Sequence, residues 1–325
     1  MKKKVLITGA GGFIGSHLVE LCVDRGIEVK AFVHYNSRNH WAWLEGSPCL
    51  KKIEVVVGDI RDYDSVFHAM NGCDKVFHLA ALIGIPYSYV SPQAYIKTNV
   101  EGTYNVLQSA KELGLKSVIV TSTSETYGTA QYVPIDEKHH AVGQSPYSAS
   151  KIAADQLAIS YHRSFGLPVK IVRPFNTYGP RQSARAVIPS IIVQILAGSK
   201  SIRLGNLSPT RDFTFVNDTA AAFLAVTKAK GLVGEATNIG TGTEISVGDL
   251  ASLIGRLMGT KIKIIEEKQR VRRKESEVER LLCDNRKILA STLWRPSYSL
   301  EKGLMDTIQW IKKNKSYYKS ELYNV

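Results

Sequence analysis

The sequence predicts an α/β protein with a doubly wound parallel sheet and a smaller α/β region beside it. Three observations predict this class. Short apolar runs rich in Val and Ile recur, longer amphipathic stretches separate them, and a glycine-rich segment follows the first run directly. Because parallel strands cannot be joined by tight hairpins, each amphipathic stretch is expected to be a right-handed helical crossover that covers the sheet.

The expected strands follow in order along the chain, at residues 5–7, 29–33, 53–57, 75–78, 117–121 and 169–172. Beyond about residue 180 the alternation loosens, and Pro180, Pro189, Pro209 and Pro296 interrupt it. We therefore expect the sheet domain at residues 1–180, with segments near 211–242 returning to it. Residues 181–325 are expected to form mainly the smaller region.

Composition excludes several classes of protein. Of the 325 residues, 44% are hydrophobic and 22% charged, which is the range of folded globular chains. No run approaches the roughly 20 apolar residues that cross a bilayer. The basic N-terminus is followed by only three apolar residues, too few for a signal peptide, which needs about 7–15. The four cysteines form no C-x-x-C pair, so we expect no disulfide framework, no metal site and a reduced, cytoplasmic protein.

The chain carries a formal net charge of +13. Its basic residues are spread along the chain, with local clusters only at residues 270–274 and 312–315. This distribution is typical of a solvated face, so neither nucleic acid nor a membrane is an expected partner. The surplus of arginine and lysine suits a phosphorylated metabolite.

The first expected strand runs into a loop in which Gly9, Gly12 and Gly15 are spaced three apart, and a helix is expected over residues 16–25. Such a loop turns tightly and leaves the backbone bare, so that a pyrophosphate can approach the helix N-terminus. The sequence therefore predicts a Rossmann dinucleotide site, which includes Phe13 and Ile14 of the same loop.

The second expected strand lacks the acid that would bind the ribose of NAD, and Arg38 follows it. Arg38 suits the 2′-phosphate of NADP, but no arginine follows the strand directly, as a strong NADP signal requires. NAD is therefore the expected cofactor, and NADP stays open. Asp59 and Ile60 follow the third strand. Asp59 is placed either to accept the adenine amino group or to cap a helix.

Tyr147 and Lys151 lie four residues apart, on one face of an expected helix. Lys151 is expected to lower the pKa of the Tyr147 phenol, which makes the pair an acid/base; the alternative is an ordinary surface pair. Thr123, Ser124 and Glu125 follow the fifth strand, at the sheet edge where open α/β folds bind ligands.

Together these motifs resemble the extended short-chain dehydrogenases/reductases, in the NAD-dependent epimerase/dehydratase family. Further matching motifs lie at residues 78–81, 99–103, 173–181, 211–213 and 238–240, so the resemblance covers nearly the whole chain. It implies cofactor contacts from Leu79, Ala80, Ala81 and Asn99, in addition to Tyr147 and Lys151.

Within that family the resemblance implies a 4,6-dehydratase, because C4 epimerases usually lack a carboxylate at the position of Glu125. The motif Thr123-Ser124-Glu125 is similar to the motif of GDP-mannose dehydratases and differs from the Thr-Asp-Glu motif of dTDP-glucose dehydratases. Glu125 would then act as base and afterwards as acid, or pass protons through Ser124 or water. The alternative for Glu125 is a solvent-facing carboxylate.

The resemblance also implies a sugar-nucleotide substrate. Arg181, Arg211 and Arg272 correspond to positions that hold the diphosphate, and Asn176 to one that binds a phosphate or sugar oxygen. Arg185, Arg273 and Arg280 are either equally close to the diphosphate or plain surface, and we interpret them as surface. The sequence is most similar to 4,6-dehydratases of nucleotide-activated N-acetylglucosamine in legionaminic and pseudaminic (nonulosonic) acid pathways, with UDP and GDP both open.

Two other functions stay open: a sugar-nucleotide C4 epimerase, and a non-catalytic protein that senses NAD(P). Helices are expected over residues 98–113 and 148–165. In relatives the equivalent helices pair as a four-helix bundle, which implies a homodimer; internal packing is the alternative.

Overall fold

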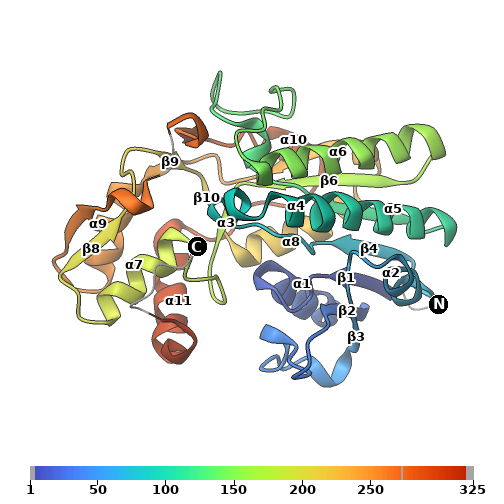
Figure 1. The fold of residues 1–325 in the computed structure, drawn as a ribbon, viewed down its shortest axis with the longest axis horizontal. Helices are drawn as coiled ribbons and strands as arrows, with labels where there is room; N and C mark the ends of the chain where they lie inside the picture. Colours follow the sequence, from blue (N-terminus) through green and yellow to red (C-terminus); the bar gives the residue numbers. More distant parts are fainter. Residues whose placement is uncertain (1–3, 272–273, 320–325) are drawn as a thin grey trace.

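The structure is a computed structural model that describes residues 4–271 and 274–319. At its centre lies a seven-stranded sheet in which every pairing is parallel (Figure 1). The strand order is β11-β6-β5-β4-β1-β2-β3, so the order reverses between β1 and β4. The bounds are β1 Lys4–Thr8, β2 Glu28–His34, β3 Glu54–Gly58, β4 Lys75–His78, β5 Ser117–Thr121, β6 Val169–Pro174 and β11 Ala236–Ile239. The predicted doubly wound fold is confirmed, and each of the six expected strands overlaps an observed one.

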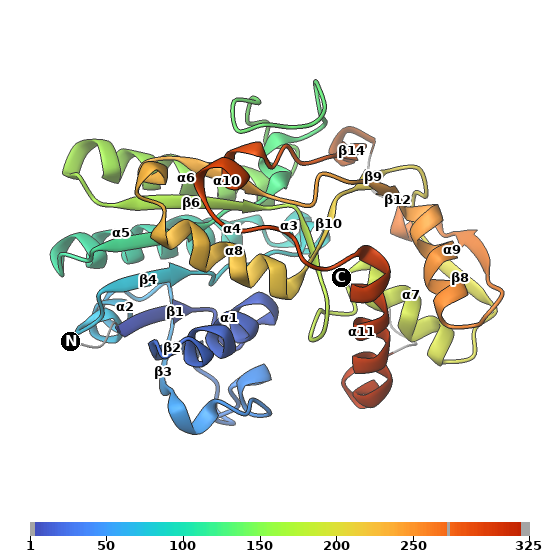
Figure 2. The ribbon, with the colours of Figure 1, turned by 180° about the vertical axis from the view of Figure 1, so that it is seen from behind.

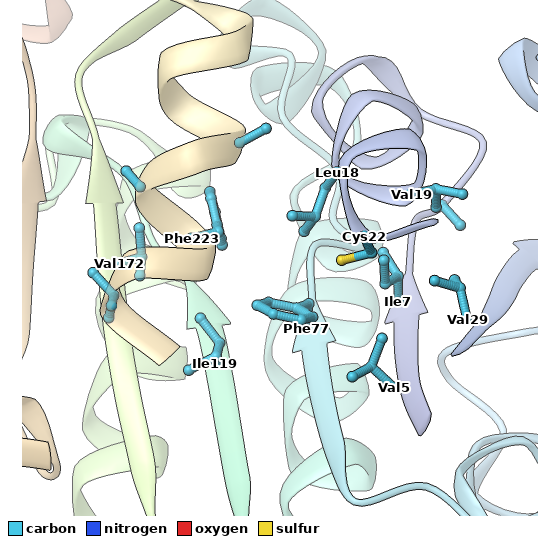
Figure 3. Packing of buried hydrophobic residues seen from close by; sticks show 14 of the residues in the cluster. Val5, Ile7, Leu18, Val19, Cys22, Val29, Phe77, Ile119, Val172 and Phe223 are labelled. Carbon is cyan, nitrogen blue, oxygen red and sulfur yellow. The ribbon is translucent and has the colours of Figure 1, made fainter. Parts of the chain in front are cut away.

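Helices cover both faces of this sheet. One face carries α1 (Phe13–Asp24), α8 (Val216–Lys228) and α10 (Arg286–Ser291); the other carries α2 (Tyr63–Met70), α5 (Gly102–Glu112) and α6 (Pro146–Phe165) (Figures 1 and 2). Apolar side chains fill the space between each layer and the sheet. Figure 3 shows part of the first layer, where Leu18, Cys22 and Phe223 face Ile7, Phe77, Ile119 and Val172.

The ends of the helices follow local chemistry. Gly12 takes an extended conformation as the N-cap of α1, so this helix begins at Phe13, three residues earlier than predicted. Ser145 and Ser148 form a capping box at the start of α6, and Gly166 ends that helix with φ 68°. The expected helix over 98–113 begins instead with a π-helical segment, Ile96–Glu101, which leads into α5.

The smaller region lies beyond the carboxyl ends of the strands (Figure 1). It contains α7 (Val187–Leu196), α9 (Val247–Leu257), α11 (Leu300–Lys313) and the paired strands β8 (Ser201–Leu204) and β13 (Lys263–Glu266). These elements share an apolar core of their own. Short strands link the two parts: β7 (Asn176–Tyr178) pairs with β10 (Phe213–Phe215), and β9 (Thr210–Arg211) pairs with β12 (Ile245–Ser246) and β14 (Arg280–Leu281).

Short helices complete the described chain. They are α3 Ile85–Val90, α4 Pro92–Tyr95 and the 3-10 helices Ala42–Leu44, Leu50–Lys52, Ser124–Tyr127, Lys230–Leu232, Lys268–Arg270, Lys274–Ser276 and Lys315–Tyr317. All four cysteines are free thiols. Over residues 4–271 and 274–319 no group of His, Cys, Asp or Glu is arranged to hold a metal, and no helix is long and apolar enough to cross a membrane.

Candidate active site

A cavity of about 1410 Å³ lies where the carboxyl ends of the parallel strands face the smaller region. This is the place where doubly wound folds bind their ligands. The cavity brings together most of the residues singled out from the sequence: Gly9, Gly12, Phe13, Ile14, Gly15, Arg38, Asp59, Ile60, Leu79, Ala80, Ala81, Thr123, Ser124, Glu125, Tyr147, Lys151, Asn176 and Arg211.

The glycine loop forms a bare backbone cradle. Gly9 has φ +67°, and a Cβ there would lie 2.8 Å from the backbone nitrogen of Ala80. A Cβ on Gly15 would lie 2.2 Å from the carbonyl oxygen of Gly9, so both glycines are required sterically. No side chain caps the N-terminus of α1, and its first turn holds no acid. The free N–H groups and the helix dipole therefore fit a dinucleotide pyrophosphate.

The adenosine end of the cavity has no carboxylate at the end of β2. There the Asn36 side chain accepts from the N–H groups of Arg38 (3.2 Å) and His40 (3.0 Å), which shapes the loop. Asp59 bonds the guanidinium of Arg61 (Nε–Oδ1 2.9 Å), and this bond lowers the pKa of Asp59. The helix-cap alternative for Asp59 is wrong, because a different residue, Asp62, caps α2.

Tyr147 and Lys151 lie at the start of α6 and are 7% and 3% exposed, so the surface-pair alternative is wrong. Burial raises the pKa of Tyr147 strongly, and a hydrogen bond with Thr123 opposes this. Burial also lowers the pKa of Lys151 to about 8, which Asp155 partly offsets. In the protein by itself burial thus outweighs the expected effect of Lys151 on the phenol, and both groups are held toward their neutral forms.

Thr123, Ser124 and Glu125 face the cavity from the end of β5. Thr123 accepts from the backbone N–H of Glu125 (3.2 Å) and so starts a 3-10 turn that holds the carboxylate in the cavity wall. Glu125 is half-buried, which disagrees with the alternative of a solvent-facing carboxylate. Across the cavity Asn176 has a buried Oδ1 with no hydrogen-bond partner among the described residues. Its position suits a bound donor group.

Asn99 is not brought into the cavity wall. Its amide is fully buried, accepts from the N–H of Leu82 (2.8 Å), and donates to the Leu82 carbonyl (3.0 Å) and the Ser150 hydroxyl (2.9 Å). Asn99 therefore acts on the loop after β4, which it ties to α6, instead of lining the cofactor site as expected. The Thr8 hydroxyl holds the same loop by accepting from Leu79 and Ala80 (both 3.1 Å).

Arg181 is also placed differently from the prediction. It has φ 71°, and its side chain leaves the cavity to pair with Glu20 of α1 (2.8 Å). In this structure Arg181 therefore does not line the cavity where the diphosphate contact was expected. Arg272 and Arg273 lie outside the described residues. Arg280 pairs with Glu244 at the surface, in agreement with its interpretation as plain surface.

Four charged residues of the cavity wall were not assigned to the site from the sequence: Arg61, Arg185, Arg270 and Glu277. Arg185 was interpreted as surface, yet its Nη1 would lie 3.3 Å from a Cβ on Gly84, at the end of the cavity near Tyr95. Its position four residues after Arg181 is the only local signal for it. Arg211 donates to the Thr210 carbonyl (2.9 Å) and contacts Glu277 (3.4 Å).

A dinucleotide cradle beside a buried tyrosine and lysine, with a threonine hydroxyl at the phenol, defines the class of extended short-chain dehydrogenases/reductases. The chain belongs to one family of this class: the family model described as GDP-mannose 4,6 dehydratase matches residues 6–307. It is an enzyme of the sugar-nucleotide dehydratase and epimerase family.

Relatives in this family catalyse different reactions. The chain is 31% identical to a dTDP-glucose 4,6-dehydratase of Streptomyces antibioticus (97% of this chain, 94% of the relative). It is 36% identical to a UDP-N-acetyl-α-D-glucosaminuronate decarboxylase of Bacillus cytotoxicus (96% and 99%). Among solved structures, a UDP-glucuronic acid 4-epimerase of Bacillus cereus in complex with UDP-glucuronic acid and NAD has TM-score 0.87 and 28% identity (96% and 99%). A dTDP-glucose 4,6-dehydratase double mutant of Streptomyces venezuelae, solved with NAD, has TM-score 0.86 and 28% identity (97% and 98%).

Proposed function

We propose that the protein is a sugar-nucleotide 4,6-dehydratase that converts UDP- or GDP-linked N-acetylglucosamine, or a similar hexose, to the 4-keto-6-deoxy sugar. The observation that carries this is Glu125. Its carboxylate lines the same cavity as Tyr147 and contributes to the high pKa of that phenol, so the two groups lie close together. A carboxylate here has a task in elimination and none in C4 epimerisation.

NAD is the proposed cofactor, since the glycine cradle fits it and solved relatives contain it. When bound, NAD supplies a hydride acceptor that takes hydrogen from C4 and returns it to C6, so none is consumed overall. We assign its binding to residues 1–180 with the returning segments near 211–242, and substrate binding mainly to residues 181–325. The proposed location is the cytoplasm.

The residues of the chain carry the proton transfers. Thr123 and Tyr147 hold the C4 hydroxyl, and the Tyr147 phenolate, stabilised by Lys151, accepts its proton. The C4 ketone acidifies the hydrogen at C5, and Glu125 removes it. Glu125 then protonates the departing C6 hydroxyl directly or through Ser124 or water. The proton taken from the C4 hydroxyl returns to C5, so one water leaves and the atoms balance.

Arginines hold the substrate in this proposal. Arg185, Arg211 and Arg270 line the cavity from the smaller region. A guanidinium binds phosphate through two parallel N–H groups, which suits a nucleotide diphosphate. The unpartnered Oδ1 of Asn176 is placed to accept from a sugar hydroxyl. Arg181 has no part in this set, because Glu20 holds it.

The test is mass spectrometry of the purified protein with UDP-N-acetylglucosamine, GDP-N-acetylglucosamine, GDP-mannose and dTDP-glucose, each without added cofactor. Loss of about 18 mass units, one water, from one of them establishes dehydration and identifies the nucleotide. Unchanged mass with a new C4 epimer by NMR would establish the epimerase instead. No change with any substrate would contradict the proposal for these sugars.

We also infer a homodimer through α5 and α6. Both helices cover one face of the sheet and leave large apolar side chains exposed: Tyr104 is 46% and Phe165 is 54% exposed. Ile96, in the π-helical segment before α5, is 53% exposed. Apolar side chains of this size on neighbouring elements suit an isologous four-helix contact.

A further inference from the structure

A buried ion pair lies behind the catalytic residues. Asp155 is 1% exposed and follows Lys151 by four residues on α6, so it lies one turn farther along the same face. Its Oδ2 accepts three hydrogen bonds: from the Ser122 hydroxyl at the end of β5 (2.7 Å), and from Nε (3.1 Å) and Nη2 (2.9 Å) of Arg173 in β6. Its Oδ1 is buried and has no hydrogen-bond partner among the described residues.

Arg173 is fixed on its other side. Its Nη1 donates to the Tyr127 hydroxyl (3.0 Å), which in turn donates to the Asn238 side chain of β11 (2.7 Å). The chain of contacts therefore runs from α6 across β5, β6 and β11. Because every link is buried, Arg173 is held rigidly against Asp155.

A buried ion pair of this kind contributes little to the stability of the fold. Desolvating two charges offsets most of their attraction, and an apolar pair of similar volume is often as stable. The unpartnered Oδ1 adds a further cost. A buried carboxylate that is only partly satisfied, one turn from the catalytic lysine, calls for a functional explanation.

The protonation state of Lys151 provides that explanation. Lys151 is 3% exposed and lines the cavity, its Nζ makes no hydrogen bond within the part of the chain that the structure describes, and burial lowers its pKa to about 8. A neutral lysine cannot stabilise the Tyr147 phenolate. We propose that Asp155 is a positioning residue that keeps Lys151 protonated through its charge, and that Arg173 limits this charge by pairing with it.

The other titratable groups around the pair do not replace Asp155. Glu125, Tyr95 and Asp155 all raise the pKa of Tyr147, whereas Asp155 is the carboxylate that also raises the pKa of Lys151. His78 of β4 is buried, and its pKa is lowered to about 3, so it carries no charge. Lys170 of β6 points to the opposite face of the sheet, where it donates to the Val226 and Thr227 carbonyls of α8.

The experiment compares two holoenzyme variants that remove opposite charges, Asp155→Asn and Arg173→Met. Both protons of the Tyr147–Lys151 pair are bound more weakly without Asp155 and more strongly without Arg173. The acid and the alkaline limb of the pH profile of kcat should therefore both shift to lower pH, by about one unit, in Asp155→Asn. In Arg173→Met both limbs should shift to higher pH by a similar amount. Arg163→Met, an exposed arginine in the last turn of α6, is the matched control and should move neither limb.

If the Asp155–Arg173 pair has only a structural role, a different result is expected. Both variants would then lose stability or activity with unmoved limbs, or with limbs moved in the same direction, and the proposal would be overturned. Because removing one partner of a buried pair can prevent folding, the neutral double variant Asp155→Asn/Arg173→Met is included. Its limbs should return toward those of the parent enzyme, and a limb that stays displaced as in Asp155→Asn contradicts the role of Arg173.

The inference rests on the proposed acid/base role of Tyr147 and Lys151, but not on the sugar nucleotide. A second readout therefore uses no substrate: the ultraviolet titration of the Tyr147 phenol, taken as the difference between each holoenzyme variant and its Tyr147→Phe counterpart. Opposite shifts of this midpoint support the proposal even if the mass-spectrometric test excludes dehydration. Equal midpoints in both variants overturn it and leave the dehydratase assignment intact.

Discussion

At the residue scale, the site depends on groups that burial holds away from their charged forms. Tyr147 keeps its proton and Lys151 tends to lose its own, because both are almost completely enclosed. Glu125 is only half-buried. The proposed base at C4 is therefore enclosed, whereas the proposed base at C5 is partly open to solvent.

Two substitutions separate these steps. Glu125→Gln keeps the shape of the side chain and removes the base, so C4 oxidation should proceed while elimination stops. Reduced cofactor should then accumulate on the enzyme and absorb near ~340 nm. Tyr147→Phe removes the C4 base and should give neither absorbance nor product, with kcat reduced by about 10²–10⁴-fold. If mass spectrometry shows full turnover by the Glu125→Gln enzyme, the dehydratase assignment is wrong.

At the scale of elements, the sequence predicts most strands, whereas contacts between residues far apart in the chain hold the loop after β4 in place. The strand itself is evident from its apolar run, and the six expected strands are all present. The four-residue strand β11 (Ala236–Ile239) was not predicted as a strand, because the polar Thr237 and Asn238 interrupt its apolar run. The π-helical start before α5, which contacts α6, was also not predicted, since no local residue pattern distinguishes it from an α-helical turn.

Substitution of Asn99 tests the element it holds. Asn99→Ala removes three buried hydrogen bonds to Leu82 and Ser150, and should lower the free energy of unfolding by about 1–3 kcal/mol. It should also reduce the NAD that remains bound after gel filtration, since the loop borders the glycine cradle. Urea unfolding and cofactor content measure the two effects, with the exposed Asn71→Ala as control. If both stay at the parent values, the loop does not depend on Asn99.

At the scale of the whole molecule, the two parts are joined through side chains far apart in the sequence. Glu20 accepts from Arg181 (2.8 Å) and from the Ser47 hydroxyl (2.7 Å), while Trp43 packs on Trp310 of α11, with ring centroids 5.2 Å apart. These contacts bring α1 and the loop after β2 against the smaller region.

The two arginines of one loop should therefore behave differently. Arg181→Met breaks the Glu20 pair and should leave KM for the sugar nucleotide within about threefold, with a modest loss of stability. Arg185→Met removes a cation of the cavity wall and should raise KM about tenfold or more. Steady-state kinetics and thermal unfolding measure both. An Arg181→Met enzyme with the larger rise in KM would show that this side chain reaches the substrate after all.

The oligomeric state is the last prediction at this scale. The parent protein should have about twice the chain mass of 35.9 kDa by light scattering. Tyr104→Glu places a charge in the proposed α5–α6 contact and should yield the monomer. Leu293→Glu alters a fully exposed leucine after α10, on the other face of the sheet, and serves as control. A parent protein of single-chain mass would contradict the dimer.

The sequence by itself determined six of the seven strands of the sheet, the glycine cradle and the order of the proposed catalytic residues, because each depends on spacing within one strand, loop or helical turn. Tertiary structure alone decided which arginine of residues 181–185 faces the cavity. Arg181 is drawn to Glu20, 161 positions away, and Arg185 is left at the cavity wall. It also decided that Asn99 supports a loop and that Asp155 pairs with Arg173. The role of a side chain at a site depends on which charged or hydrogen-bonding group, distant in the sequence, it contacts. Local spacing in the sequence does not predict that contact.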